Sequence, residues 1–146
     1  MPNSKKIKFA VVGTGHIGKR HAEMIHREEE AELVALADIR SKKECNAESF
    51  DVPFFSSIEE LLESGIEIDV VNICTPNGLH AEQSLLSLKE KKHVVCEKPM
   101  GLKKDACEKI IFKALQVSRQ VFCVMQNRYS PPSEWIKSIV EDGILG

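Results

Sequence analysis

The sequence contains no long apolar run, no surplus of basic residues and no closely paired cysteines. No stretch approaches the ~20 apolar residues that span a bilayer, and no long apolar segment follows the basic start, so we expect neither a membrane protein nor a secretory signal. Lysine and arginine number 20 against 22 acidic residues, which argues against a nucleic-acid partner. The five cysteines form no CxxC pair, which argues against a disulfide framework and a zinc site. We therefore expect a cytoplasmic protein without a bound metal.

Short apolar runs alternate with helical patterns along the 146 residues. Because the runs are almost continuously hydrophobic, they are typical of strands covered on both faces, as in a parallel sheet. The order predicts an α/β fold: a doubly wound parallel sheet of Rossmann type, with about six strands and helices on both faces, forming one dinucleotide-binding domain over residues 1–146. The expected strands are 7–13, 32–38, 52–56, 69–75, 93–97 and 120–126. The expected helices are 16–29, a short one started by a capping box of Ser57 and Glu60, 78–91, 104–117 and one from Ser130 to Gly143.

The segment "VVGTGHIGKRH" has the G-x-G-x-x-G spacing between a predicted strand and a predicted helix. Gly13 would make the tight turn, Gly15 would let a pyrophosphate approach the backbone, and Gly18 would let the helix pack against the sheet. Asp38 ends the second strand 20 residues after Gly18, where a carboxylate accepts hydrogen bonds from the ribose hydroxyls. The pattern indicates a dinucleotide site; a structural turn that binds no ligand is the alternative.

The residues around the loop and the acid complete the predicted adenosine half of the site. Since Asp38 would repel a 2′-phosphate, NAD is the expected cofactor, and NADP stays open because basic residues follow the acid. The further cofactor-binding candidates here are His16, Ile17, Ile39 and Arg40. His16, His21 and His26 recur every five residues and spiral around the helix, so they predict no metal site, and His21 and His26 are expected at the surface.

Polar residues also follow the fourth, fifth and sixth strands, whose carboxyl ends should share the cofactor edge of the sheet. "CTPNGLH" offers Asn77 as a helix cap and His80 in the first turn facing the crevice; the alternative is a plain cap and a solvated histidine. In "HVVCEKPM", Pro99 restricts Lys98 to extended geometry, and its amine would polarise a substrate hydroxyl or carbonyl. The alternative is an ordinary surface lysine.

Taken together, "AVVGTGHIG", "ADI", "NICTPNGLHAEQSL", "HVVCEKPMGL" and "QNRYSPPSEWIKSIVEDGILG" resemble the N-terminal half of the Gfo/Idh/MocA family, which includes glucose–fructose oxidoreductase and inositol dehydrogenases. The resemblance implies NAD(P)-dependent oxidation of a secondary alcohol on a sugar, cyclitol or nucleotide sugar. It also implies Lys98 as the catalytic lysine, Glu97 at the nicotinamide ribose, and a cis bond before Pro99. Thr75, Pro76, Asn77 and His80 would line the nicotinamide side. Independently of the resemblance, the end of the sixth strand is expected to bring Arg128 to the same cofactor edge of the sheet.

The resemblance further implies that the chain is a fragment lacking a C-terminal substrate domain. Such a fragment would bind NAD with little or no turnover, and the complete protein would be a homo-oligomer acting on a small molecule. The "QNRYSPP" segment is similar to enzymes that oxidise UDP-N-acetylglucosaminuronic acid. Two alternatives remain: a stand-alone regulatory module that binds NAD without chemistry, and a structural Rossmann-like domain without a ligand.

Overall fold

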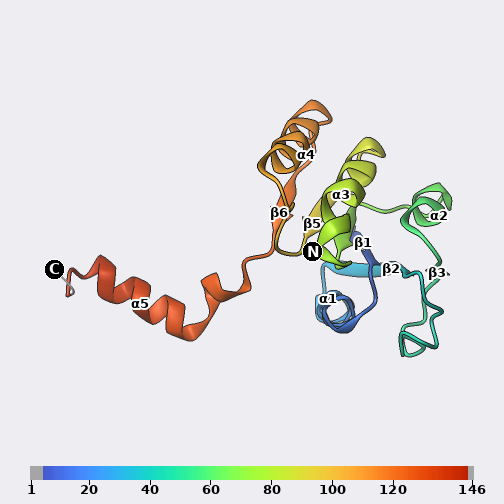
Figure 1. The fold of residues 1–146 in the computed structure, drawn as a ribbon. Helices are drawn as coiled ribbons and strands as arrows, with labels where there is room; N and C mark the ends of the chain where they lie inside the picture. The colour runs from blue at the N-terminus through green and yellow to red at the C-terminus, as the bar shows by residue number, and fades with distance from the viewer. Residues whose placement is uncertain (1–4, 145–146) are drawn as a thin grey trace.

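The computed structural model describes residues 5–144, and its centre is a parallel sheet of six strands in the order β3-β2-β1-β4-β5-β6 (Figure 1). The chain starts in the middle of the sheet, builds outward to β3, and returns to the middle at β4. Every neighbouring pair is parallel, so all carboxyl ends lie at one edge. The strands are β1 (Ile7–Val12), β2 (Ala31–Ala37), β3 (Phe54–Phe55), β4 (Val70–Ile73), β5 (His93–Cys96) and β6 (Val121–Cys123).

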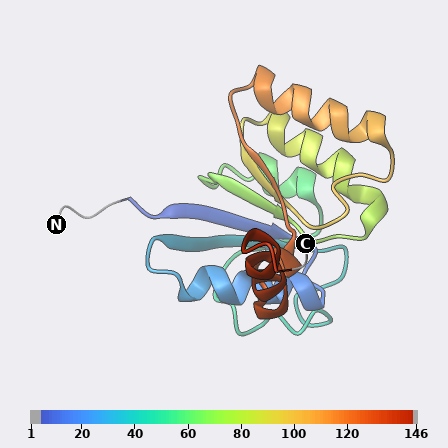
Figure 2. The same ribbon diagram turned by 90° about the vertical axis from the view of Figure 1, so that its left-hand side faces the viewer.

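Helices cover both faces of the sheet, which confirms the doubly wound prediction (Figure 2). Successive residues of β1 serve opposite faces: Ala10 and Val12 belong to one apolar cluster, and Val11 belongs to the other. The helical segments are α1 (His16–Arg27), α2 (Ile58–Glu63), the 3₁₀ turn η1 (Asn77–Leu79), α3 (His80–Lys89), α4 (Lys104–Gln116), the 3₁₀ turn η2 (Gln126–Tyr129) and α5 (Pro131–Glu141). No helix within residues 5–144 is long and apolar enough to cross a membrane.

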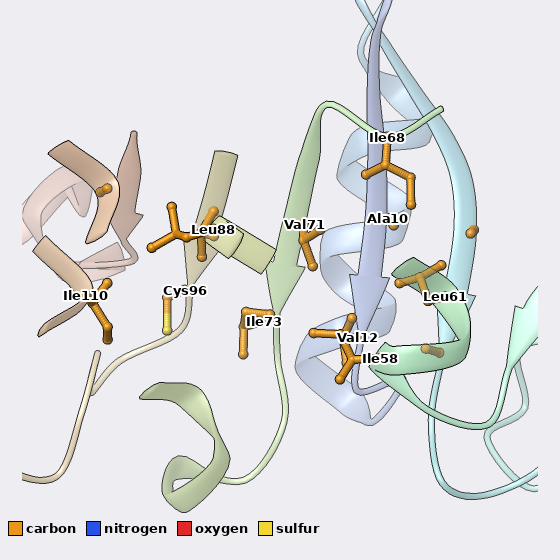
Figure 3. Packing of buried hydrophobic residues seen from close by; sticks show 14 residues of the cluster. Ala10, Val12, Ile58, Leu61, Ile68, Val71, Ile73, Leu88, Cys96 and Ile110 are labelled. Atoms are coloured by element: carbon orange, nitrogen blue, oxygen red, sulfur yellow. The ribbon is translucent and has the colours of Figure 1, made fainter. Parts of the chain in front are cut away.

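The larger apolar cluster joins α2, α3 and α4 to the strands (Figure 3). Ile73 of β4, Leu88 of α3 and Ile110 of α4 are fully buried in it. Each such side chain contributes roughly 1.5–3 kcal/mol by leaving water. The second cluster packs α1 against the opposite face through Ala22 and Ile25. The two layers therefore hold the strand ends, and the loops that follow them, in fixed positions.

Two local predictions need correction. The expected capping box at α2 is only half formed: the Ser57 hydroxyl accepts from the backbone N–H of Glu60, but the Glu60 carboxylate bonds Ser56 instead of closing back on Ser57. The expected sixth strand, 120–126, is reduced to Val121–Cys123, because it pairs with β5 alone at the sheet edge.

In α5, which extends away from the sheet in Figure 1, no residue is buried, and Trp135 remains 65% exposed.

Candidate functional site

A cavity of about 670 Å³ lies at the carboxyl ends of β1, β2 and β4, at the point where the strand order reverses. This is where ligands bind in doubly wound sheets, and the volume is within the ~300–1,000 Å³ range of small-molecule sites. Of the residues expected to bind the cofactor, the structure brings together Gly13, Gly15, His16, Ile17, Asp38, Ile39, Arg40, Thr75 and Pro76. Sequence reasoning missed the polar wall that Ser56, Ser57 and Gln83 add.

Each of the three glycines of the loop is required for a different structural reason. Gly13 has a φ of +87°, and a Cβ there would lie 2.7 Å from the backbone of Cys74. A Cβ on Gly18 would lie 1.8 Å from the carbonyl oxygen of Gly13, so this position permits α1 to touch the loop. A Cβ on Gly15 would meet only the Arg40 side chain, at 4.0 Å, which leaves open space above the start of α1. The free N–H groups there suit an anion such as a pyrophosphate.

Asp38 is 9% exposed and immediately follows β2. One carboxylate oxygen accepts from the Thr14 backbone N–H at 2.8 Å, and the Thr14 hydroxyl donates to the same oxygen at 3.2 Å. The guanidinium and backbone N–H of Arg40 donate to the carboxylate at 3.0 Å each. Burial raises the pKa of Asp38, but the bonds from Arg40 and Thr14 outweigh burial and hold it well below its usual range. Asp38 is therefore ionised at neutral pH and ready to accept hydrogen bonds.

Arg40 forms an ion pair with the Asp38 carboxylate, and both residues line the cavity. Its side chain is 48% exposed, whereas that of Asp38 is 7% exposed. The guanidinium therefore forms the solvent-facing side of a bidentate ion pair whose carboxylate is buried. Cys74 also lines the cavity, but burial raises the pKa of its thiol to about 12, so it is no thiolate nucleophile at neutral pH.

A second hollow, of about 400 Å³, contains Lys98 and Arg128. Lys98 is the second residue after β5, the neighbour of β4. The Lys98–Pro99 peptide bond is cis, as the resemblance implied. Arg128 comes from η2, which also supplies Gln126 and Asn127. Because β1 and β5 run in the same direction, Lys98 and the glycine loop lie at one edge of the sheet.

The expectations for Asn77 and His80 are corrected by the structure. Asn77 does not cap α3; it begins the exposed turn η1 and makes no side-chain cap bond. This turn rotates His80 inward, where it is 1% exposed instead of facing the crevice or solvent. Its ring nitrogens lie 2.7 Å from the carbonyl oxygens of Pro99 and Thr75. His80 therefore holds together the loops that follow β4 and β5.

The expectation that His21 lies at the surface is also wrong. Its Nε2 atom lies 3.1 Å from a carboxylate oxygen of Glu97, and its Nδ1 atom lies 3.0 Å from the amide nitrogen of Asn72. Glu97 is itself 7% exposed and lines neither cavity. The polar Asn72 inside the apolar run "VVNIC" was the sequence signal that could have indicated a buried polar contact.

A doubly wound parallel sheet, a glycine loop at its switch point and an ionised acid after the second strand define a Rossmann-type NAD-binding domain. Residues 7–125 match the family described as "Oxidoreductase family, NAD-binding Rossmann fold". The chain belongs to this family, the Gfo/Idh/MocA oxidoreductases.

Relatives and solved structures agree with this assignment. The inositol 2-dehydrogenase of Rubrobacter xylanophilus is 34% identical over 99% of the chain and 42% of its own length. The WlbA dehydrogenase of Bordetella pertussis, solved with NADH and UDP-GlcNAcA, superposes with a TM-score of 0.88 at 30% identity, over 95% of the chain and 44% of WlbA. The scyllo-inositol dehydrogenase of Lactobacillus casei, solved with NAD(H) and scyllo-inositol, gives 0.83 at 29% identity, over 97% and 43%. The chain thus spans less than half the length of these proteins.

Proposed function

We propose that this chain is the cofactor-binding part of an NAD-dependent dehydrogenase that oxidises a secondary alcohol of a sugar, cyclitol or nucleotide sugar. The observation that carries the proposal is Lys98: it enters a hollow at the same sheet edge as the glycine loop and Asp38. The named activities of the inositol relatives support this substrate class. The remaining length of those relatives supports a substrate domain that completes the pocket.

The residues around the larger cavity fit NAD. The open space at Gly15 suits the pyrophosphate, and Asp38 suits the adenosine ribose hydroxyls. Because the Asp38 carboxylate is ionised, it disfavours a 2′-phosphate and thereby favours NAD over NADP. We assign Gly13, His16, Ile17, Gly18, Ile39 and Arg40 to the same half of the site, and Thr75, Pro76, Asn77, Glu97, Lys98 and Arg128 to the nicotinamide half. His80 acts indirectly, by holding the Thr75 and Pro99 loops.

NAD supplies the hydride acceptor for this chemistry. The Lys98 amine bonds the substrate hydroxyl, takes its proton as the alcohol becomes a carbonyl, and returns a proton in the reverse direction. Arg128, in the same hollow, provides a fixed positive charge for an anionic substrate group. This charge, the "QNRYSPP" segment and the similarity to WlbA support a uronic acid of a UDP-sugar as the substrate.

Thermal unfolding with and without NAD tests whether the chain binds the cofactor. At 100 times Kd, NAD should stabilise the folded chain by about 2.7 kcal/mol, which raises Tm by roughly 5–10 °C. The chain alone should convert no alcohol, because the substrate pocket is incomplete. No Tm shift at millimolar NAD would contradict the proposed function. A shift together with a complete enzyme that oxidises no sugar or cyclitol would favour a regulatory module.

Replacing Asp38 by alanine should weaken NAD binding by about 10–100-fold, because a charged acceptor for the ribose hydroxyls is lost. The preference for NAD over NADP should shrink at the same time. Titration calorimetry with both cofactors measures the two effects, and Asp51→Ala, at an exposed position in the loop before β3, is the matched control. An unchanged NAD affinity in a folded Asp38→Ala chain would remove Asp38 from the site.

A further inference from the structure

Three side chains from three different elements form a buried polar chain beneath the site. Asn72 of β4 is 4% exposed, the Glu97 residue after β5 is 7% exposed, and the His21 side chain of α1 is 15% exposed. His21 lies between the other two, 3.0 Å from Asn72 and 3.1 Å from Glu97. The second Glu97 oxygen accepts the backbone N–H of Lys98 at 3.2 Å. The chain therefore runs from the helix after the glycine loop to Lys98.

The contacts of His21 constrain its imidazole protons. A carboxylate oxygen accepts hydrogen bonds, so the contact with Glu97 requires a proton on Nε2 of His21. The Asn72 amide nitrogen, 3.0 Å from Nδ1, can donate to that atom when it carries no proton. The Asn72 Oδ1 atom is buried and has no partner within residues 5–144. A buried polar group without a partner lowers stability, so Asn72 at this position needs a reason other than folding.

We propose that His21 is a positioning residue for Lys98 and acts through Glu97. This inference rests on the proposed function, in which Glu97 and Lys98 serve the nicotinamide half. With His21 in place, the Glu97 carboxylate is held at both oxygens and fixes the backbone of Lys98. Without His21, the carboxylate rotates freely, the Lys98 N–H loses a fixed acceptor, and the amine is no longer aimed at the hollow. Asn72 fixes the tautomer that makes this possible.

Turnover and cofactor affinity, measured in the enzyme completed by its substrate domain, separate positioning of Lys98 from general support of α1. Replacing His21 by leucine should lower kcat by about tenfold, because the Lys98 amine is aimed less well, and should leave NADH affinity within about twofold. His21→Gln should recover most of kcat, because its amide can still donate to Glu97. His26→Leu, at an exposed position on the same helix, should change neither quantity.

Each result of these measurements either supports or overturns the role proposed for His21. Unchanged kcat in His21→Leu, or a loss of NADH affinity as large as the loss of kcat, would overturn the inference and leave the proposed function standing. A wild-type enzyme that binds no NADH, or that oxidises no sugar or cyclitol, would overturn the proposed function, and the inference with it. If His21→Leu fails to fold, the ¹⁵N spectrum of the wild-type imidazole decides. A proton on Nε2 supports the inference, and a proton on Nδ1 alone overturns it.

Discussion

Replacing Lys98 by methionine, in the enzyme completed by its substrate domain, should lower kcat by about 10³-fold with NADH affinity nearly unchanged. Methionine keeps the length and apolar stem of the side chain but removes the amine that bonds the reacting oxygen. Proton transfer by a positioned group supplies about 10²–10⁴-fold and a single electrostatic donor about 10²–10³-fold, so the loss of one such group is expected to cost about 10³-fold. Steady-state kinetics and NADH titration measure the two quantities separately.

Lys103→Met is the matched control for this variant. Lys103 is an exposed lysine five residues further along the chain and lines neither cavity. It should leave both kcat and NADH affinity unchanged. A Lys98→Met enzyme with near-normal kcat would show that Lys98 is an ordinary surface lysine, and the reaction would then need its acid and base from the substrate domain.

Gly18→Ala should destabilise the chain by more than about 3 kcal/mol or prevent folding, whereas Gly15→Ala should cost less than about 1 kcal/mol. The added Cβ at Gly18 would lie 1.8 Å from the Gly13 carbonyl oxygen, so α1 would have to move away from the loop. The added Cβ at Gly15 would meet only Arg40, at 4.0 Å, and the remaining cost is that of alanine at a helix N-cap. Urea unfolding of the two variants measures both values.

NADH titration completes this comparison. Although Gly15→Ala should fold, it should bind NADH more weakly, because its methyl group occupies space that the pyrophosphate needs. Equal stability of the two variants would contradict the packing role of Gly18, and an unchanged NADH affinity in Gly15→Ala would contradict the phosphate role of Gly15.

The α/β architecture could be predicted because its signals are local. A parallel strand buried on both faces must be apolar along its length, and the runs at β1, β2, β4 and β5 satisfy this condition. The structure confirms these strands within one or two residues. Strands β3 and β6 are shorter than expected, because each has a single neighbour in the sheet. The apolar pattern of α5 predicted a helix correctly, but a helical pattern does not identify what covers it.

The environments of His21 and His80 could not be predicted from the sequence. Both residues follow loops whose roles were predicted from the sequence, yet the predicted environments of both side chains were wrong. Their partners are Glu97 for His21 and the Pro99 carbonyl for His80, and these lie 76 and 19 residues further along the chain. Such contacts depend on which strand ends become neighbours, and no local pattern encodes that.

By itself, the sequence determined the order of strands and helices, the glycine loop and the acid that follows it. These features depend on backbone conformation and apolar periodicity within a few residues. Only the tertiary structure decided that His80 ties two loops together and that a buried polar chain joins α1, β4 and Glu97. Hydrogen bonds of this kind form between atoms that the packing of separate elements brings within about 3 Å, so they exist only once the sheet is assembled.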